Sequence, residues 1–128
     1  EDHARDFPSV FTLLAKALGY RPHTPAPDGQ PVYYPDWVAG MFMLLSSPVL
    51  RSVGGFDEHY FLYYEDVDLC ARLRDKGLQV AVCTGTSVIH AAQRESRRNL
   101  RYAAWHMRSA ARFLASRPAI ALGLRAKR

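Results

Sequence analysis

The chain has 128 residues, of which 48% are hydrophobic, and this size and composition predict a single domain with its own core. Its formal net charge of +5 is unevenly spread, because acidic residues cluster between Asp57 and Asp75 while arginines dominate after Arg94. Cys70 and Cys83 are too few for a disulfide framework, and no apolar run approaches the roughly 20 residues that span a bilayer. These features argue against a disulfide-rich secreted domain and against a membrane-spanning chain. We expect a reduced, cytoplasmic setting.

The N-terminal segment predicts a helix followed by a linker. Between Phe7 and Leu18, apolar residues recur at helical spacing, and Gly19 follows the last turn. The segment 21–31 contains four prolines and an Asp-Gly pair, which predict an extended loop with a turn. Residues 1–31 are therefore interpreted as a short helix and a proline-rich linker.

An apolar run comes next in the chain. From Trp37 to Leu45 it is apolar on both faces, which predicts a fully buried strand. Gly40 within this run predicts a close approach of another group to the backbone. Ser46 or Ser47 can cap a short helix that follows.

Residues 54–69 combine a glycine pair, an aromatic run and five carboxylates. This segment leads into a predicted helix from Asp66 to Gly77, on which Asp66 shares a face with apolar residues. Asp68 and Arg72 are four residues apart, and we expect them to form a surface pair that contributes only tenths of a kcal/mol.

The last third of the chain predicts a strand, a turn and a basic helix. Residues 78–83 alternate as a strand does, and Thr84 and Gly85 predict a turn before His90. From Arg97 to Ser116 the spacing predicts a helix that Pro118 stops. One row of this helix is apolar and a second row consists of arginines: Leu100, Ala104, Met107, Ala111 and Leu114, beside Arg97, Arg101, Arg108 and Arg112.

Several motifs in their order resemble the C-terminal half of family 2 inverting glycosyltransferases, and most closely the bacterial rhamnosyltransferase-like members. The resemblance covers roughly residues 32–114. It is carried by Trp37-Val38-Ala39-Gly40, Gly54-Gly55-Phe56-Asp57-Glu58, the run from Phe61 through Glu65-Asp66-Val67-Asp68 to Leu73, and Val88-Ile89-His90.

The resemblance implies an α/β fold: the C-terminal part of a GT-A fold, with helices packed on a small mixed sheet. It implies that Asp66 is the general base, which removes the proton of the acceptor hydroxyl. His90 matches a histidine that joins a divalent metal, Mn²⁺ or Mg²⁺. The residues matched to the sugar and acceptor sites are Trp37, Gly40, Asp57, Glu58, Tyr64 and Glu65.

The family's nucleotide-binding half, with its Asp-x-Asp metal motif, has no counterpart in this sequence. We therefore expect a fragment that is inactive alone, with 32–92 as the acceptor half and 93–128 as a basic amphipathic helix and tail. The missing half would bind most of the metal. The implied partners are a nucleotide-sugar donor, with rhamnose as the expected sugar, and a glycan or lipid-linked acceptor in surface polysaccharide synthesis. Apolar surface left uncovered between Trp37 and Leu45 predicts self-association.

Each functional interpretation has a structural alternative. An acid at the position of Asp66 also caps free helix amides, and a histidine such as His90 can simply end a strand. Aromatic clusters are more often core than sugar platforms, and we expect Phe61 inside and at least one tyrosine at the site. The arginine row is either a solvated helix face or a surface for anionic lipid on the inner face of the plasma membrane.

Two other functions compete with the enzyme. A non-catalytic carbohydrate-binding or interaction module would use the aromatic residues to bind sugar and Asp66 only as a cap. A basic nucleic-acid-binding domain would use the arginine helix, but the acidic centre would repel phosphates and no reader motif is present, so we expect no nucleic-acid partner.

Overall fold

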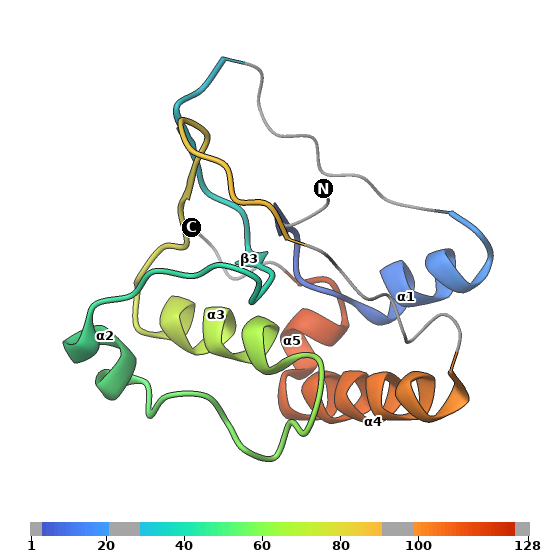
Figure 1. Cartoon of the computed structure of the whole chain (residues 1–128). Coiled ribbons are helices and arrows are strands. Elements are labelled where there is room, and N and C mark those ends of the chain that lie inside the picture. The colour runs from blue at the N-terminus through green and yellow to red at the C-terminus, as the bar shows by residue number, and fades with distance from the viewer. Residues whose placement is uncertain (1–3, 21–28, 91–98, 125–128) are drawn as a thin grey trace.

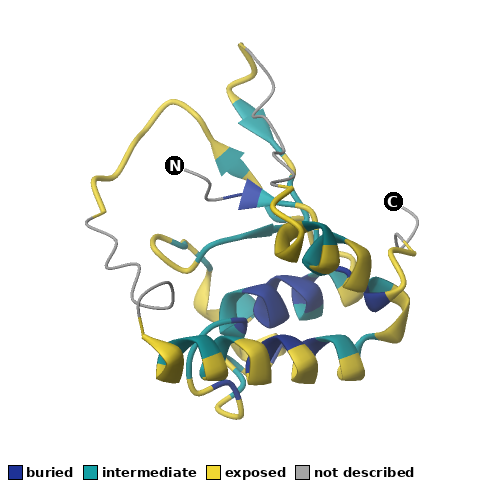
Figure 2. Ribbon diagram, turned by 90° about the vertical axis from the view of Figure 1, so that its right-hand side faces the viewer, coloured by how far each residue is buried: buried dark blue, intermediate teal, exposed yellow. Residues whose placement is uncertain are grey.

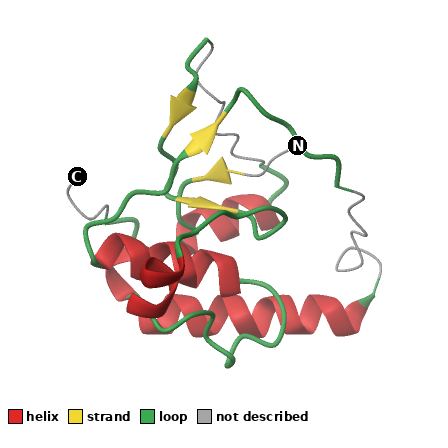
Figure 3. Ribbon diagram, turned by 60° about the vertical axis from the view of Figure 1, so that its left-hand side comes forward, coloured by secondary structure: helices red, strands yellow, loops and turns green. Residues whose placement is uncertain are grey.

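The structure is a computed structural model that describes residues 4–20, 29–90 and 99–124. Short strands lie on one side of the molecule and helices on the other (Figures 1 and 3). In chain order the elements are β1 (Ala4–Arg5), α1 (Val10–Ala17), β2 (Val32–Tyr33), β3 (Trp37–Val38), α2 (Ser47–Ser52), α3 (Glu65–Asp75), β4 (Val82–Cys83), α4 (Leu100–Ser116) and α5 (Pro118–Ala121).

The strands form two antiparallel pairs. β1 pairs with β3 so that Ala4 lies opposite Val38, and β2 pairs with β4 so that Val32 lies opposite Cys83. Helices and strands are both present, as predicted for an α/β fold, but the expectation of one mixed sheet is wrong for the described residues. Pro35 interrupts the chain between β2 and β3, and a proline has no N–H with which to continue a ladder.

The predicted first helix is confirmed as α1. Ser9 is its N-cap, and its hydroxyl accepts a hydrogen bond from the Thr12 N–H, while the Thr12 hydroxyl accepts one from the Ser9 N–H. Gly19 follows the helix with φ of 90°, a conformation that glycine adopts without a steric penalty. The greater part of the predicted linker, residues 21–28, lies outside the described residues.

The prediction of a buried strand from Trp37 to Leu45 is wrong. Strand pairing ends at Val38, because the Gly40 N–H donates to a side chain instead of a neighbouring strand. Beyond it Phe42 and Leu44 are 70% and 92% exposed, whereas Met43 and Leu45 pack against the buried cluster Val53, Leu69 and Leu73. Only one side of this segment therefore contacts the core.

Helix α3 is the centre of the core. It lies between the strands and α4, and most of its residues are buried (Figure 2). Its Val67 and Ala71 pack with Tyr60, Tyr64, Ala110 and Phe113, and Phe7, Leu13 and Trp37 cover this cluster. The three segments distinguished in the sequence thus share one core, which fixes α3 from several sides.

Helix α4 faces the core mostly with residues outside the predicted apolar row, although Leu114 of that row packs against the buried cluster. Ser109, Ala110 and Phe113 are buried, whereas Leu100 and Met107 of the predicted apolar row are 89% and 71% exposed. The helix ends at Ser116 and α5 begins at Pro118, so the predicted stop is confirmed. Arg117 between them has φ of −136° and ψ of 68°, outside the helical region that the residue before a proline avoids.

Candidate functional site

Asp66 lies in the first turn of α3, next to the backbone of Gly40. Its Oδ2 atom accepts a hydrogen bond from the Gly40 N–H at 2.8 Å, and its Oδ1 atom accepts one from the Val67 N–H at 2.8 Å. A Cβ atom on Gly40 would lie 3.5 Å from the Asp66 Cβ, so a side chain at this position would be in van der Waals contact with the carboxylate. The close approach predicted at Gly40 is confirmed, and the group that approaches is the predicted base.

The environment of Asp66 makes its charged form costly. Burial raises the pKa of its carboxyl above the ordinary value of 3.8, although the hydrogen bonds from Gly40 and Val67 act in the opposite direction. A carboxylate can accept about four hydrogen bonds, and each oxygen here accepts one bond from a neighbouring amide. Each oxygen therefore keeps a lone pair that can take a proton, as a general base requires.

Glu65 is half-buried beside Asp66. Its Oε2 atom is shielded from solvent and has no hydrogen-bond partner among the described residues. Burial raises its pKa, and the neighbouring Asp66 charge raises it further. Both effects favour the protonated form of the Glu65 carboxyl.

Asp57 and Glu58 lie in the loop that precedes α3. The Asp57 carboxylate accepts from the backbone N–H of His59 at 3.0 Å and contacts its imidazole Nδ1 at 2.6 Å, and these two interactions lower the Asp57 pKa. Glu58 is exposed. No hydrogen bond or ion pair joins Asp57 or Glu58 to Asp66 within the part of the chain that the structure describes.

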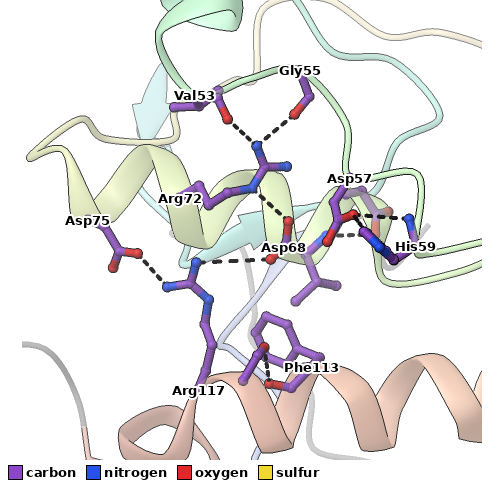
Figure 4. A network of polar contacts seen from close by, with 12 residues as sticks. Val53, Gly55, Asp57, His59, Asp68, Arg72, Asp75, Phe113 and Arg117 are labelled. Atoms are coloured by element: carbon purple, nitrogen blue, oxygen red, sulfur yellow. Dashed lines mark hydrogen bonds and ion pairs between the residues drawn. The ribbon is translucent and has the colours of Figure 1, made fainter.

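A polar network holds the start of this loop (Figure 4). Arg72 donates from Nη1 to the carbonyl oxygens of Val53 and Gly55, and from Nε to the Asp68 carboxylate at 2.7 Å. The expectation that Asp68 and Arg72 form a surface pair is wrong, because Asp68 is only 6% exposed. The pair is buried at the end of α2, where the carbonyl groups of Val53 and Gly55 accept hydrogen bonds from Arg72.

Two predicted substrate-binding aromatic residues have structural roles here. The Trp37 indole N–H donates to the Asp6 carbonyl oxygen at 3.0 Å, and its ring packs on the core. Tyr64 is 6% exposed, with its ring against Phe113, and burial raises its pKa to about 12. Contact between these rings and a sugar stays a prediction. Phe61 was expected inside but is 76% exposed, and it packs against Trp105.

His90 is exposed and lies away from regular structure, just before the residues 91–98 that are not described. Among the described residues, no three His, Cys, Asp or Glu side chains lie close enough together to hold a metal ion. The described part of this chain therefore does not fit a complete metal site, and His90 could supply one ligand at most.

Two residues near the site have roles that the sequence analysis missed. Asp68 is a buried acceptor for Arg72, and His106 of α4 contacts the rings of Tyr63 and Tyr64. His106 has no ligand spacing with the other histidines, so the sequence indicated no role for it. Its spacing of four and seven residues from Ala110 and Phe113 was the available signal, since this spacing places all three on one helix face.

Comparison with known proteins gives the site its context. The rhamnosyltransferase WbbL of Escherichia coli K12 is 41% identical over 81 residues, which are 62% of this chain and 31% of that protein. An N-acetylglucosaminyl-diphospho-decaprenol L-rhamnosyltransferase of Mycobacterium tuberculosis is 38% identical over 99 residues, 77% of this chain and 31% of that protein. The chain is a homologue of rhamnosyltransferases. The resemblance predicted from its motifs is confirmed.

A third relative is named as a hexosyltransferase. The low-salt glycan biosynthesis hexosyltransferase Agl10 of Haloferax volcanii is 28% identical over 85 residues, 65% of this chain and 27% of that protein. The chain thus spans about a third of the length of its glycosyltransferase relatives, 31% for the rhamnosyltransferases. No protein-family model and no solved structure matches it.

Proposed function

We propose that this chain is the acceptor-side part of an inverting glycosyltransferase in which Asp66 is the general base. The observation that carries the proposal is the pairing of Asp66 with the Gly40 amide, in a chain whose relatives are named as rhamnosyltransferases. The intact enzyme moves a sugar, with rhamnose as our specific proposal, from a nucleotide-diphospho-sugar to a glycan or lipid-linked acceptor. The 128-residue chain alone does not catalyse transfer.

The chemistry follows from what the Asp66 carboxylate can do. It removes the proton of the acceptor hydroxyl as that oxygen attacks the anomeric carbon of the donor. The bond from this carbon to the diphosphate breaks as the new bond forms, and the diphosphate leaves with the electron pair. Attack and departure occur on opposite faces of the sugar, which inverts the anomeric centre, and the proton remains on Asp66.

Neighbouring carboxylates have separate roles in this proposal. Glu65 orients the acceptor, because its half-buried carboxyl lies next to Asp66 in the first turn of α3. Asp57 and Glu58 contact the acceptor from the loop that Arg72 holds. A divalent metal is part of the proposal only as a group that neutralises the leaving diphosphate. His90 would be one ligand, and the other ligands would come from outside the described residues.

The acceptor and the place of action are also proposed. One relative is named for a diphospho-decaprenol acceptor, which is a lipid-linked sugar. The exposed side of α4 carries Arg101, Arg108 and Arg112, and no acidic residue occurs between Leu100 and Ser116. We place this face against anionic lipid on the cytoplasmic side of the membrane. Among the described residues, no helix has the length and apolar character needed to cross a bilayer.

The test is the variant Asp66→Asn in the full-length gene product, compared with Asp75→Asn at the exposed end of the same helix. Loss of the base lowers kcat by about 10²–10⁴-fold, while donor binding remains. Because burial raises the Asp66 pKa, the acid limb of the wild-type rate lies at higher pH than for an ordinary aspartate.

Two controls make this test decisive. The pH–rate profile of the residual Asp66→Asn activity lacks the acid limb. Asp75→Asn keeps both the wild-type rate and the acid limb of the wild-type profile. An Asp66→Asn enzyme with normal turnover would contradict the assignment of the base. It would favour the sugar-binding module, in which this residue only caps the helix.

A further inference from the structure

Two consecutive tyrosines enter α3 with left-handed backbone. Tyr63 and Tyr64 have φ of 66° and 71°, and Tyr64 is the N-cap residue of α3 without a side-chain capping bond. This conformation is uncommon for bulky residues and persists only where the surroundings impose it. The pair lies immediately before Glu65, so its conformation sets the direction in which the helix carrying Asp66 begins.

Helix α4 contacts each residue of the segment 61–64. Phe61 packs against Trp105 with ring centroids 5.0 Å apart, and the Ser109 hydroxyl donates to the Leu62 carbonyl oxygen at 2.8 Å. The His106 ring meets both tyrosines nearly edge-on, with centroids 5.1 Å from Tyr63 and 5.4 Å from Tyr64. One side chain of α4 thus contacts both left-handed residues.

His106 is suited to this position as a neutral ring. Burial lowers its pKa below the ordinary value of 6.5, and the nearby charge of Lys16 lowers it further, so the imidazole is uncharged at neutral pH. Edge-on aromatic contacts contribute free energies of the same order as the cost of a left-handed residue. Two such contacts can therefore offset the backbone strain of the tyrosine pair.

We infer that His106 is a positioning residue, which holds Tyr63 and Tyr64 in left-handed backbone and thereby places the Asp66 carboxylate against the Gly40 amide. The inference rests on the proposed function only where it concerns turnover. The position of Asp66 itself can be measured without activity, because the Gly40 N–H donates directly to its Oδ2 atom. The amide resonance of Gly40 therefore titrates with Asp66.

The first experiment follows this amide by NMR through a pH titration of the chain. We compare His106→Leu, which removes the ring, with His106→Phe, which keeps one, and with Met107→Ala at a neighbouring exposed position. The midpoint of the Gly40 titration moves in His106→Leu and remains at the wild-type value in the other two. If His106→Leu does not fold, Tyr63→Ala removes the Tyr63–His106 contact without introducing a residue that favours left-handed backbone, and it moves the midpoint as well.

The second experiment measures kinetics in the full-length gene product. His106→Leu lowers kcat by about 10-fold or more with an unchanged KM for the donor, as expected for a displaced base. His106→Phe restores kcat. An unmoved Gly40 midpoint in folded His106→Leu or Tyr63→Ala overturns the inference. A wild-type enzyme without transferase activity instead overturns the proposed function, and leaves the titration to decide the role of His106.

Discussion

Asp68 shows how a single buried carboxylate organises its neighbours. It accepts from Arg72 at 2.7 Å, and an Arg117 nitrogen lies 3.9 Å from its other oxygen. Arg72 in turn donates to two carbonyl groups of the loop before the site. Because Asp68 is buried and central to this network, its removal leaves the partly desolvated guanidinium of Arg72 without a counter-charge.

We therefore predict a large difference between two acids of the same helix. Asp68→Ala lowers the free energy of unfolding by about 3 kcal/mol, as for other broken buried pairs. Asp75→Ala also breaks an ion pair to Arg117, but its side chain is 63% exposed, and the loss stays below about 1 kcal/mol. Urea denaturation of both variants at neutral pH measures the difference, and equal losses would contradict this account of the network.

At the scale of elements, α4 has two faces with different tasks. Its inner face holds the segment before α3 through His106, Ser109 and Phe113. Its outer face exposes arginines beside Leu100 and Met107. A surface without acidic side chains attracts anionic headgroups, and the exposed apolar side chains can enter the boundary of the lipid.

Binding to vesicles tests this outer face. We expect the chain to sediment with vesicles that contain anionic lipid and to stay in solution with neutral ones. The double variant Arg101→Gln with Arg108→Gln weakens binding by about 30-fold, since each arginine near the surface contributes about 1 kcal/mol. The matched control is Arg51→Gln at an exposed position of α2. Equal binding to neutral and anionic vesicles would rule out the proposed surface.

The sequence predicted where helices begin and end better than which residues they contact in the folded chain. Caps and stops depend on single residues with local effects, such as Gly19 after α1 and Pro118 after α4, and these predictions are confirmed. The pairing of Gly40 with Asp66 was anticipated only as a close approach of an unnamed group. Hydrophobic spacing cannot show which of two neighbouring faces meets the core, and so the inner face of α4 was not recognised.

The sequence predictions that were wrong or missing in the site depend in the same way on contacts between distant residues. Asp68 and Arg72 have the spacing of an exposed pair, and only the carbonyl groups of Val53 and Gly55, distant in sequence, make their burial favourable. The left-handed backbone of Tyr63 and Tyr64 has no sequence signal, because neither residue favours it. Tertiary contacts with α4 decide whether this left-handed backbone forms and at which residues it lies.

At the scale of the whole molecule, apolar side chains gather on the surface of two segments. Phe42 and Leu44 are 70% and 92% exposed in the loop after β3, and Phe11 and Leu18 are 65% and 88% exposed near α1. Exposed apolar surface of this kind commonly marks an interface. The matched residues make up only 31% of each rhamnosyltransferase relative, which is consistent with the proposal that other parts of an intact enzyme cover this surface.

We predict that the isolated chain self-associates through the loop after β3. Light scattering during size-exclusion chromatography should show an average mass that rises with concentration. The double variant Phe42→Ser with Leu44→Ser shifts the chain toward the monomer, because it removes the two most exposed apolar side chains of this loop. Leu122→Ser, at a 61% exposed position of α5, leaves the distribution unchanged. A monomer at all concentrations would contradict the prediction.

The hydrogen bond between Gly40 and Asp66 links this surface to the proposed chemistry. Gly40 is followed directly by Met41 and Phe42, so a molecule that packs on those side chains and moves the loop also moves the amide that stabilises the carboxylate. Such a molecule changes the proton affinity of Asp66. By thermodynamic linkage, protonation of Asp66 changes the affinity for that molecule by the same factor. Binding at the loop and protonation of Asp66 are therefore thermodynamically coupled, and either one can be measured through its effect on the other.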